Sequence, residues 1–124
     1  MTVSVIIPSY NHAKYLRERI DSVLDQTFRD FEVIILDDCS TDNSRSIICE
    51  YKDKHPDIVA IFSDSNSGSP FAQWNLGVNK SKGEFIWIAE SDDSADPRFL
   101  EKTVAVMRQN PNAGLVFCDS RIIN

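Results

Sequence analysis

The chain has 124 residues and a formal net charge of −6, and 42% of its residues are hydrophobic. This length is enough for one domain with a buried core, and the composition is typical of a globular protein and excludes a largely disordered one. The negative charge argues against nucleic acid or an anionic membrane surface as the main partner, because both carry the same sign of charge. It does not exclude a phosphorylated small molecule whose charge a metal ion balances.

Short apolar runs alternate with longer amphipathic segments along the chain, which predicts alternating strands and helices. Pro8 is expected to end the first strand and Asn11 to cap the helix that follows. Ser40 or Thr41 is expected to cap the second helix, and Pro97 to lie in the first turn of the last one. In chain order, the predicted elements are a strand over 3–7, a helix near 13–27, a strand over 31–36, a helix through Ile47, Ile48 and Tyr51, a strand over 58–62, a helix with Phe71, Trp74 and Val78 on one face, a strand over 85–89, a helix whose apolar face is Leu100, Val104 and Met107, and a strand over 115–118.

Strands and helices that alternate in this order imply right-handed crossovers and a mostly parallel sheet with helices on both faces. We therefore predict a three-layer α/β/α fold formed by a single domain over residues 1–124, since no repeat, linker or low-complexity tract divides the chain. The last predicted strand runs into Asp119, and no helix follows it before Asn124. We expect this chain to be the N-terminal part of a longer protein.

The three cysteines are Cys39, Cys49 and Cys118, and none of them forms a CxxC pair. An odd number of cysteines without metal-ligand spacing predicts reduced thiols in a cytoplasmic protein. No apolar stretch approaches the roughly 18 residues that a membrane span needs, so we expect no transmembrane segment in this chain.

An acidic cluster, Glu90-Ser91-Asp92-Asp93, directly follows the apolar strand predicted over 85–89. Carboxylates this close repel one another, and a bound cation, protonation or water relieves the repulsion. Oxygen ligands of this kind suit a hard divalent ion that also binds phosphate. The cluster therefore predicts a metal–diphosphate site at the carboxyl edge of the sheet. For Asp92-Asp93, a solvated loop before Pro97 is the alternative to a metal site.

Polar residues follow two other predicted strands as well. The first strand leads into Pro8-Ser9-Tyr10-Asn11, and the second into Asp37-Asp38. In open parallel sheets, ligands bind beyond the carboxyl ends of the strands. For Asp37-Asp38, turn and capping chemistry competes with a role in accepting a hydrogen bond from a nucleotide base. For Tyr10, an ordinary aromatic position competes with a flat surface on which a base stacks.

Other candidates have weaker functional signals. We expect Trp74 and Trp87 to be core residues, and His12 and His55 to be solvated, since neither histidine has a partner at metal-ligand spacing. The chain has no glycine-rich phosphate loop of the GxxxxGK[ST] or GxGxxG type. A diphosphate would therefore be held chiefly through a metal ion.

Several segments occur in the order and spacing that is found in the family 2 glycosyltransferases, and residues 3 to about 118 resemble that family. The matching segments are Val3-Ser4-Val5-Ile6-Ile7-Pro8-Ser9-Tyr10-Asn11, Ser22-Val23-Leu24-Asp25-Gln26-Thr27-Phe28, Phe31 to Asp42, Asn75-Leu76-Gly77, and Lys82-Gly83-Glu84-Phe85-Ile86 running into Glu90-Ser91-Asp92-Asp93.

The resemblance implies a nucleotide-sugar-binding half with the GT-A (Rossmann-like) fold. It implies that Asp38 hydrogen-bonds the donor base, usually uracil, that Tyr10 packs against the base, and that Pro8 lies beside the nucleotide. It also places Asn11 and Asn75 in the donor site.

The DxD motif of the family corresponds to Glu90-Ser91-Asp92 in this sequence. The resemblance implies that Asp92 holds Mg²⁺ or Mn²⁺ on the diphosphate and that Asp93 orients the ribose or the donor sugar. Glu90 stands where the family usually has Asp, so direct ligation and an indirect role both remain open. Trp74 stands where many members carry Arg, which removes a cation near the donor site. The family's general base comes from a second half, and we assign no catalytic residue in this chain.

We predict the donor-binding half of an inverting glycosyltransferase that transfers a sugar from a nucleoside diphosphate-sugar, most simply UDP-linked, to a hydroxyl of a saccharide or lipid-linked acceptor. The resemblance implies polysaccharide or cell-envelope synthesis in the cytoplasm, at the inner face of the membrane, with peripheral association of the full-length protein. This chain alone is expected to be inactive.

Two alternatives remain. A sugar nucleotidyltransferase would need a glycine-rich basic loop after the first strand. A non-catalytic phosphoacceptor module would need its acidic pair after the first strand, not the second.

Overall fold

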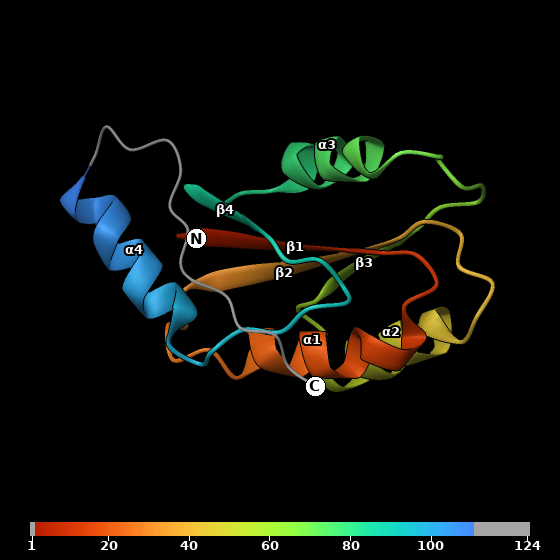
Figure 1. The fold of residues 1–124 in the computed structure, drawn as a ribbon, viewed down its shortest axis with the longest axis horizontal. Helices are drawn as coiled ribbons and strands as arrows, with labels where there is room; N and C mark the ends of the chain where they lie inside the picture. Colours follow the sequence, from red (N-terminus) through yellow and green to blue (C-terminus); the bar gives the residue numbers. More distant parts are fainter. Residues whose placement is uncertain (1, 111–124) are drawn as a thin grey trace.

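The computed structural model describes residues 2–110, which form a four-stranded sheet with helices on both faces (Figure 1). The apolar runs have become strands and the amphipathic segments helices, as the hydrophobic periodicity predicts. In chain order, the elements are β1 (Val3–Ser9), α1 (Ala13–Leu24), β2 (Phe31–Asp37), α2 (Ser44–Lys54), β3 (Val59–Phe62), α3 (Pro70–Lys80), β4 (Phe85–Ile88) and α4 (Phe99–Gln109).

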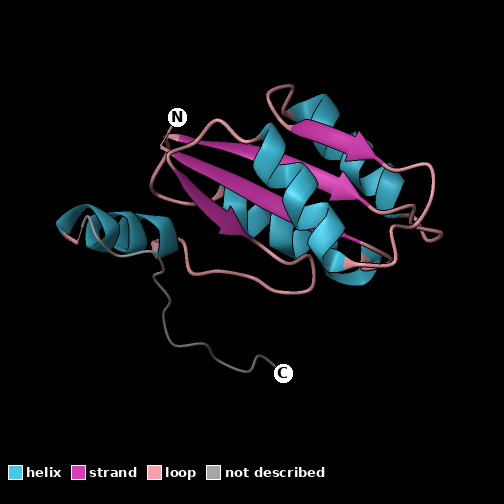
Figure 2. Ribbon diagram, turned by 90° about the horizontal axis from the view of Figure 1, so that it is seen from above, coloured by secondary structure: helices cyan, strands magenta, loops and turns pink. Residues whose placement is uncertain are grey.

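The strands lie in the order β3-β2-β1-β4, and every pair is parallel. Because all of these pairs are parallel, the carboxyl ends of the four strands lie at one edge of the sheet, and the arrowheads visible in Figure 2 point the same way. β1 pairs with β2 from Val3↔Phe31 to Ser9↔Asp37, whereas its pairing with β4 stops at Ile6↔Ile88. The predicted parallel sheet is confirmed, and the fifth predicted strand, 115–118, lies outside the described residues.

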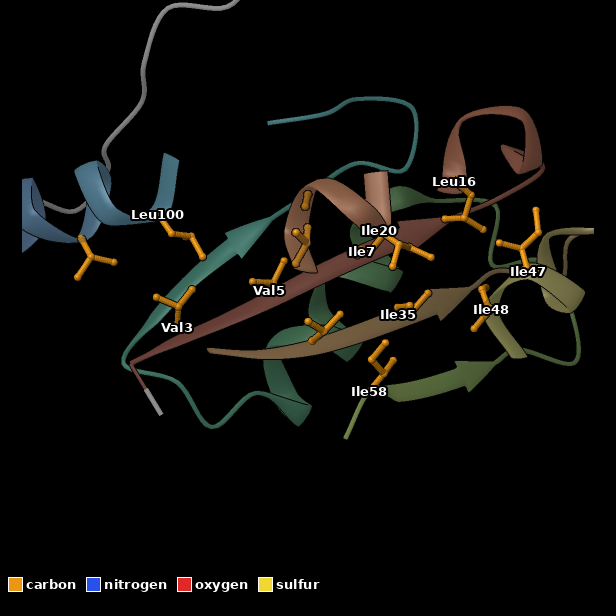
Figure 3. Packing of buried hydrophobic residues seen from close by; sticks show 14 residues of the cluster. Val3, Val5, Ile7, Leu16, Ile20, Ile35, Ile47, Ile48, Ile58 and Leu100 are labelled. Atoms are coloured by element: carbon orange, nitrogen blue, oxygen red, sulfur yellow. The ribbon is translucent and has the colours of Figure 1, made fainter. Parts of the chain in front are cut away.

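Side chains of β1 alternate between two hydrophobic clusters, as the period of two along a strand requires. Val5 and Ile7 pack with α1 and α2 on one face, as Figure 3 shows. Ile6 points to the other face, where Leu76 of α3 packs against its cluster. In Figure 1, α1 and α2 accordingly lie on one side of the sheet and α3 on the other. The predicted three-layer α/β/α architecture is confirmed.

β1 does not end at Pro8 as predicted, and runs on to Ser9. The backbone carbonyl of Ile6 accepts a hydrogen bond from the N–H of Ala89, so the backbone groups of Ile6 face the β4 side of β1. Backbone groups alternate between the two sides along a strand, so those of Pro8 face the β4 side as well. Because the pairing with β4 has already stopped at Ile6, the N–H that proline lacks is not needed there. The strand continues through its pairing with β2.

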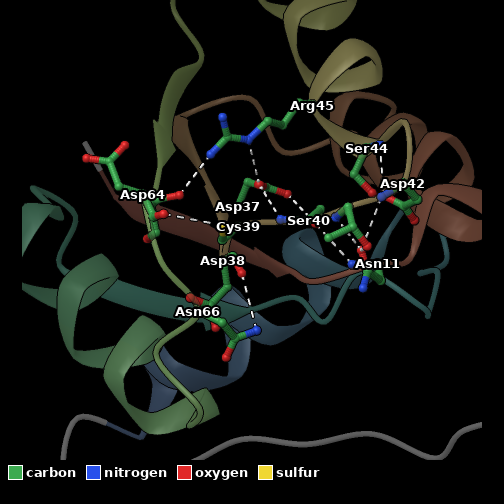
Figure 4. Close-up of polar contacts among 12 residues, drawn as sticks. Asn11, Asp37, Asp38, Cys39, Ser40, Asp42, Ser44, Arg45, Asp64 and Asn66 are labelled. Atoms are coloured by element: carbon green, nitrogen blue, oxygen red, sulfur yellow. Dashed lines mark hydrogen bonds and ion pairs between the residues drawn. The ribbon is translucent and has the colours of Figure 1, made fainter.

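The predicted helix caps are also wrong. Asn11 has a φ of 54° and does not cap α1; its Oδ1 accepts from the backbone N–H of Thr41 at 2.8 Å (Figure 4). The N–H of Ala13 in the first turn of α1 instead donates to Asp42 Oδ2 at 3.1 Å. α2 begins at Ser44, beyond the predicted caps, and α1 ends at Leu24 instead of 27. The loops after β1 and β2 therefore exchange side-chain contacts.

α3 buries a different face from the one predicted. Phe71 and Val78 are 64% and 43% exposed, whereas Gln73 and Gly77 are buried. A Cβ on Gly77 would lie only 2.6 Å from Cγ2 of Ile6, so the helix backbone packs closely on the sheet at this glycine. This close approach determines the rotation of α3 and directs Gln73 toward the sheet edge.

α4 begins at Phe99, two residues after Pro97, which therefore precedes the first turn. The buried side chain of Gln26, at the end of α1, holds the start of α4. Its Nε2 donates to the carbonyl of Asp96 at 2.7 Å, and its Oε1 accepts from the N–H of Leu100 at 2.9 Å. Gln26 thereby connects the first helix to the segment that follows the acidic cluster.

Candidate functional site

A cavity of about 380 Å³ opens at the carboxyl edge of the sheet. Four of the residues predicted from the sequence line it: Pro8 near the end of β1, Tyr10 just after that strand, Asp38 after β2, and Glu90 after β4. The rest of the wall comes from Ser9 and His12, from the loop before α3, and from Pro70 and Gln73 of that helix. The structure thus brings three separate strand ends to one cavity, as the parallel sheet predicts.

Asp38 is held rigidly at the base of this cavity. The residue is only 6% exposed, and its Oδ1 accepts from the N–H of Ser67 at 2.9 Å and from Nε2 of Gln73 at 2.8 Å. Its Oδ2 accepts from Oγ of Ser67 at 2.8 Å. An ionised carboxylate offers about four acceptor positions, so one position remains for a further donor.

The neighbouring Asp37 has a structural role. The two interpretations of the acidic pair, turn chemistry and ligand binding, therefore apply to different residues. Asp37 is fully buried and pairs with Arg45, whose Nε lies 3.3 Å from its Oδ2. It also accepts from the N–H and the hydroxyl of Ser40. Figure 4 shows Asp37 directed toward Arg45 and Ser40, away from the side on which Asp38 meets Asn66. Asp37 therefore has the turn role, and Asp38 is the member of the pair that lines the cavity.

Tyr10 and Pro8 form an apolar part of the cavity wall. Tyr10 is 45% exposed although its ring is large and aromatic. An accessible aromatic ring beside a buried carboxylate provides both a stacking surface and a hydrogen-bond acceptor, which are the two contacts that a nucleotide base needs.

Glu90 lines the cavity in a fixed orientation that the sequence did not predict. The indole Nε1 of Trp74 donates to Oε1 of Glu90 at 3.2 Å, and Nε of Arg19 donates to the backbone carbonyl of Glu90 at 2.7 Å. Next to it, Oγ of the buried Ser91 lies 2.6 Å from Nδ1 of His12. Trp74 is therefore a polar partner and not a core residue, and His12 is part of the cavity wall.

The acidic residues Asp92 and Asp93 are exposed and do not line the cavity. Within residues 2–110, no three His, Cys, Asp or Glu side chains gather as a group that could hold a metal ion. Magnesium, however, is commonly held by only one or two carboxylates together with substrate phosphates. The exposed carboxylates of Asp92 and Asp93, which belong to the acidic turn formed by residues 90–93, fit a divalent ion bound in that way and do not form an all-protein cage.

Two further predicted donor contacts lie away from the cavity. Asn75 is exposed on α3, two positions after Gln73, and Asn11 is engaged with the loop at Thr41. Gln73 and Arg19 were missed by sequence reasoning. A glutamine and an arginine within amphipathic helices look like ordinary surface residues, and only their burial distinguishes them.

The cavity lies at the carboxyl edge of an open parallel sheet, which is where proteins of this α/β class bind their ligands. Comparison with known proteins specifies the class: the family model described as "Glycosyl transferase family 2" matches residues 4–121. The chain belongs to this family.

Two relatives illustrate the relationship. The Nostoc glycosyltransferase alr2836 is 38% identical over 116 residues, which cover 94% of this chain and 36% of that protein. The poly(ribitol-phosphate) beta-N-acetylglucosaminyltransferase TarS of Staphylococcus aureus is 34% identical over 89% of this chain and 19% of its own length. This chain thus spans about a third or less of both relatives.

Solved structures confirm the GT-A fold. TarS 1–349 in complex with UDP-GlcNAc superposes with a TM-score of 0.82, covering 90% of this chain and 32% of that one. The mannosyltransferase PcManGT of Pyrobaculum calidifontis, in complex with GDP-Man and Mn²⁺, is 27% identical with a TM-score of 0.84 and covers 96% of this chain and 35% of that one. Among residues 2–110 of the present chain, no helix has the length and apolar character needed to cross a membrane.

Proposed function

We propose that this chain is the donor-binding part of an inverting glycosyltransferase and that it binds a UDP-linked sugar together with Mg²⁺ or Mn²⁺. The observation that carries the proposal is the cavity in which Asp38 lies beside Tyr10 and Pro8. One acceptor position of Asp38 remains for a donor after Ser67 and Gln73 have taken three. Uracil presents a single ring N–H, which matches one open acceptor.

The acidic turn supplies the second half of the donor site. Asp92 is the proposed metal ligand, and Asp93 the residue that orients the ribose or donor sugar. A divalent ion bound there would offset the charge of the departing nucleoside diphosphate. Glu90 has its carboxylate held by Trp74 at the cavity wall, which supports an indirect role for it in place of direct ligation.

The acceptor is proposed to be a hydroxyl of a saccharide or lipid-linked polymer, as in cell-envelope synthesis at the cytoplasmic membrane face. The similarity to TarS, a poly(ribitol-phosphate) beta-N-acetylglucosaminyltransferase, supports this class. None of residues 2–110 is assigned as the general base. We therefore propose that this chain alone has no transferase activity, and that the base belongs to a further part of a longer protein.

Calorimetric titration of the chain with UDP and Mn²⁺ tests the proposal, with Asp38→Asn as the variant. Asparagine keeps the shape and can still pair with Ser67 and Gln73, but it turns an acceptor into a donor that faces the ring N–H of uracil. Loss of one hydrogen bond to a charged group costs about 2 kcal/mol, so the UDP affinity should fall about 30-fold.

Asp57→Asn is the matched control, because Asp57 is exposed at the opposite edge of the sheet, just before β3. It should leave the affinity unchanged. An unaltered chain that binds neither UDP nor any other nucleoside diphosphate would refute the proposed function and favour a non-catalytic module.

A further inference from the structure

Arg19 is a buried cation that contacts the acidic turn. It belongs to α1 and is only 3% exposed. Its Nε donates to the carbonyl of Glu90 at 2.7 Å, and its Nη2 lies 3.7 Å from Oδ2 of Asp93. Its guanidinium carbon also lies 5.4 Å from the ring centre of Trp87, which is a cation–π distance.

Burying an arginine in this way is expensive, because a charge removed from water costs several kcal/mol unless other groups compensate it. Burial lowers the pKa of Arg19, and the negative charges of Asp93, Asp92 and Glu90 act in the opposite direction. Nη1 of Arg19 is buried and has no hydrogen-bond partner among the described residues. The acidic turn therefore supplies the compensating charge for this arginine.

Arg17, two positions earlier on the same helix, shows how an ordinary surface arginine behaves here. It is exposed and pairs with Glu50 across the α1–α2 contact. An exposed pair of this kind contributes little to stability, because water and salt screen the attraction between the two charges. The two arginines carry the same charge on one helix, but only Arg19 reaches the turn that follows β4.

The acidic turn is anchored at three points by other elements. Arg19 holds the backbone at Glu90, Trp74 holds the Glu90 carboxylate, and His12 contacts Ser91. Arg19 is the only one of the three whose side chain reaches both the backbone of the turn and one of its exposed carboxylates. Its planar fork of donors makes this double contact possible.

We propose that Arg19 is a positioning residue that holds the acidic turn in place for a divalent cation and so sets how strongly the cation enhances nucleotide binding. This inference rests on the function proposed above. A preformed turn costs less to order when the metal–nucleotide complex binds. Because Arg19 does not line the cavity around Asp38, it should not affect the contacts of the nucleotide base.

The test measures UDP affinity with and without Mn²⁺ in the unaltered chain, Arg19→Gln, Arg19→Lys and the control Arg17→Gln. We expect Mn²⁺ to strengthen UDP binding in the unaltered chain and in Arg17→Gln to the same degree. In Arg19→Gln this enhancement should shrink about tenfold, while the metal-free affinity stays the same. Arg19→Lys keeps the charge but lacks the planar fork, so it should lose an intermediate part of the enhancement.

Three results would overturn the proposal. An undiminished enhancement in both Arg19 variants would show that the turn does not need this anchor. A larger enhancement in Arg19→Gln would show that the arginine only repels the metal. An equal loss of metal-free and metal-dependent affinity would indicate a general structural role. If circular dichroism shows that Arg19→Gln is unfolded, the Mn²⁺ enhancement measured in Arg19→Lys decides between these outcomes. An unaltered chain that binds no UDP would refute the proposed function and not this inference.

Discussion

Gly77 determines how closely α3 packs on the sheet, and Gly77→Ala tests whether that packing also positions the proposed donor site. The added Cβ would lie 2.6 Å from Cγ2 and 2.9 Å from Cδ1 of Ile6. Ile6 is fully buried and branched at Cβ, so it has little freedom to rotate away. To restore an ordinary contact of 3.4 Å, the helix or the side chain must move by 3.4 − 2.6 = 0.8 Å.

Two opposing effects decide the change in stability. Replacing glycine by alanine inside a helix is worth about 1 kcal/mol of helix propensity. Overpacking a buried site costs about 1–3 kcal/mol. The net result should be a loss of about 1 kcal/mol, which lowers the unfolding midpoint by about 4 °C in a domain of this size.

The same movement should weaken nucleotide binding. Gln73, one turn before Gly77, donates to Asp38 at 2.8 Å, and a shift of 0.8 Å along this bond would lengthen it to 3.6 Å. A contact of that length no longer counts as a hydrogen bond. We therefore expect UDP affinity to fall about tenfold, which corresponds to about 1.4 kcal/mol.

Thermal unfolding followed by circular dichroism measures the first effect, and titration with UDP the second. Ile6→Ala removes the two atoms that lie closest to the added methyl group. In combination with Gly77→Ala, it should be less destabilising than the sum of the single changes, by about 1 kcal/mol. A Gly77→Ala chain that is more stable than the original and binds UDP equally well would refute this reasoning.

Two further predictions concern a single donor atom and a single titrating group. Trp74→Phe keeps an aromatic ring but removes the indole N–H that holds Glu90, so UDP affinity in the presence of Mn²⁺ should fall about fivefold, or about 1 kcal/mol. The control Val78→Ala changes an exposed residue of the same helix and should leave the affinity unchanged. Equal affinities of Trp74→Phe and the unaltered chain would contradict the role of Trp74. Burial, and then the hydrogen bond to Asp21, raise the pKa of Tyr51 to about 12, so the folded state keeps this proton while the unfolded chain loses it near its ordinary value of 10. The stability that this proton contributes is therefore complete below pH 10 and is lost as the pH rises toward 12. In urea unfolding, Tyr51→Phe should flatten the decline of the unfolding free energy with pH over this range, and the control Tyr15→Phe should not. An unchanged decline in Tyr51→Phe would contradict the assignment.

The amino-acid sequence by itself determined the alternation of strands and helices and the parallel sheet. It also identified which strand ends carry polar residues. These properties follow from short-range periodicity, because a buried strand and an amphipathic helix each repeat within a few residues. Once the sheet is parallel, its topology brings Tyr10, Asp38 and Glu90 to one edge, so this part of the candidate site was predictable.

Only the tertiary structure decided which polar residues support that edge. Gln73 contacts Asp38 across 35 residues of chain, and Arg19 contacts the carbonyl of Glu90 across 71. Nothing local distinguishes either residue from its solvated neighbours. The rotation of α3 depends on one glycine packed against Ile6, and the burial of Arg19 depends on a turn that arrives much later in the chain. Such contacts arise when separate elements pack together, so a pattern that repeats over three or four residues does not contain them.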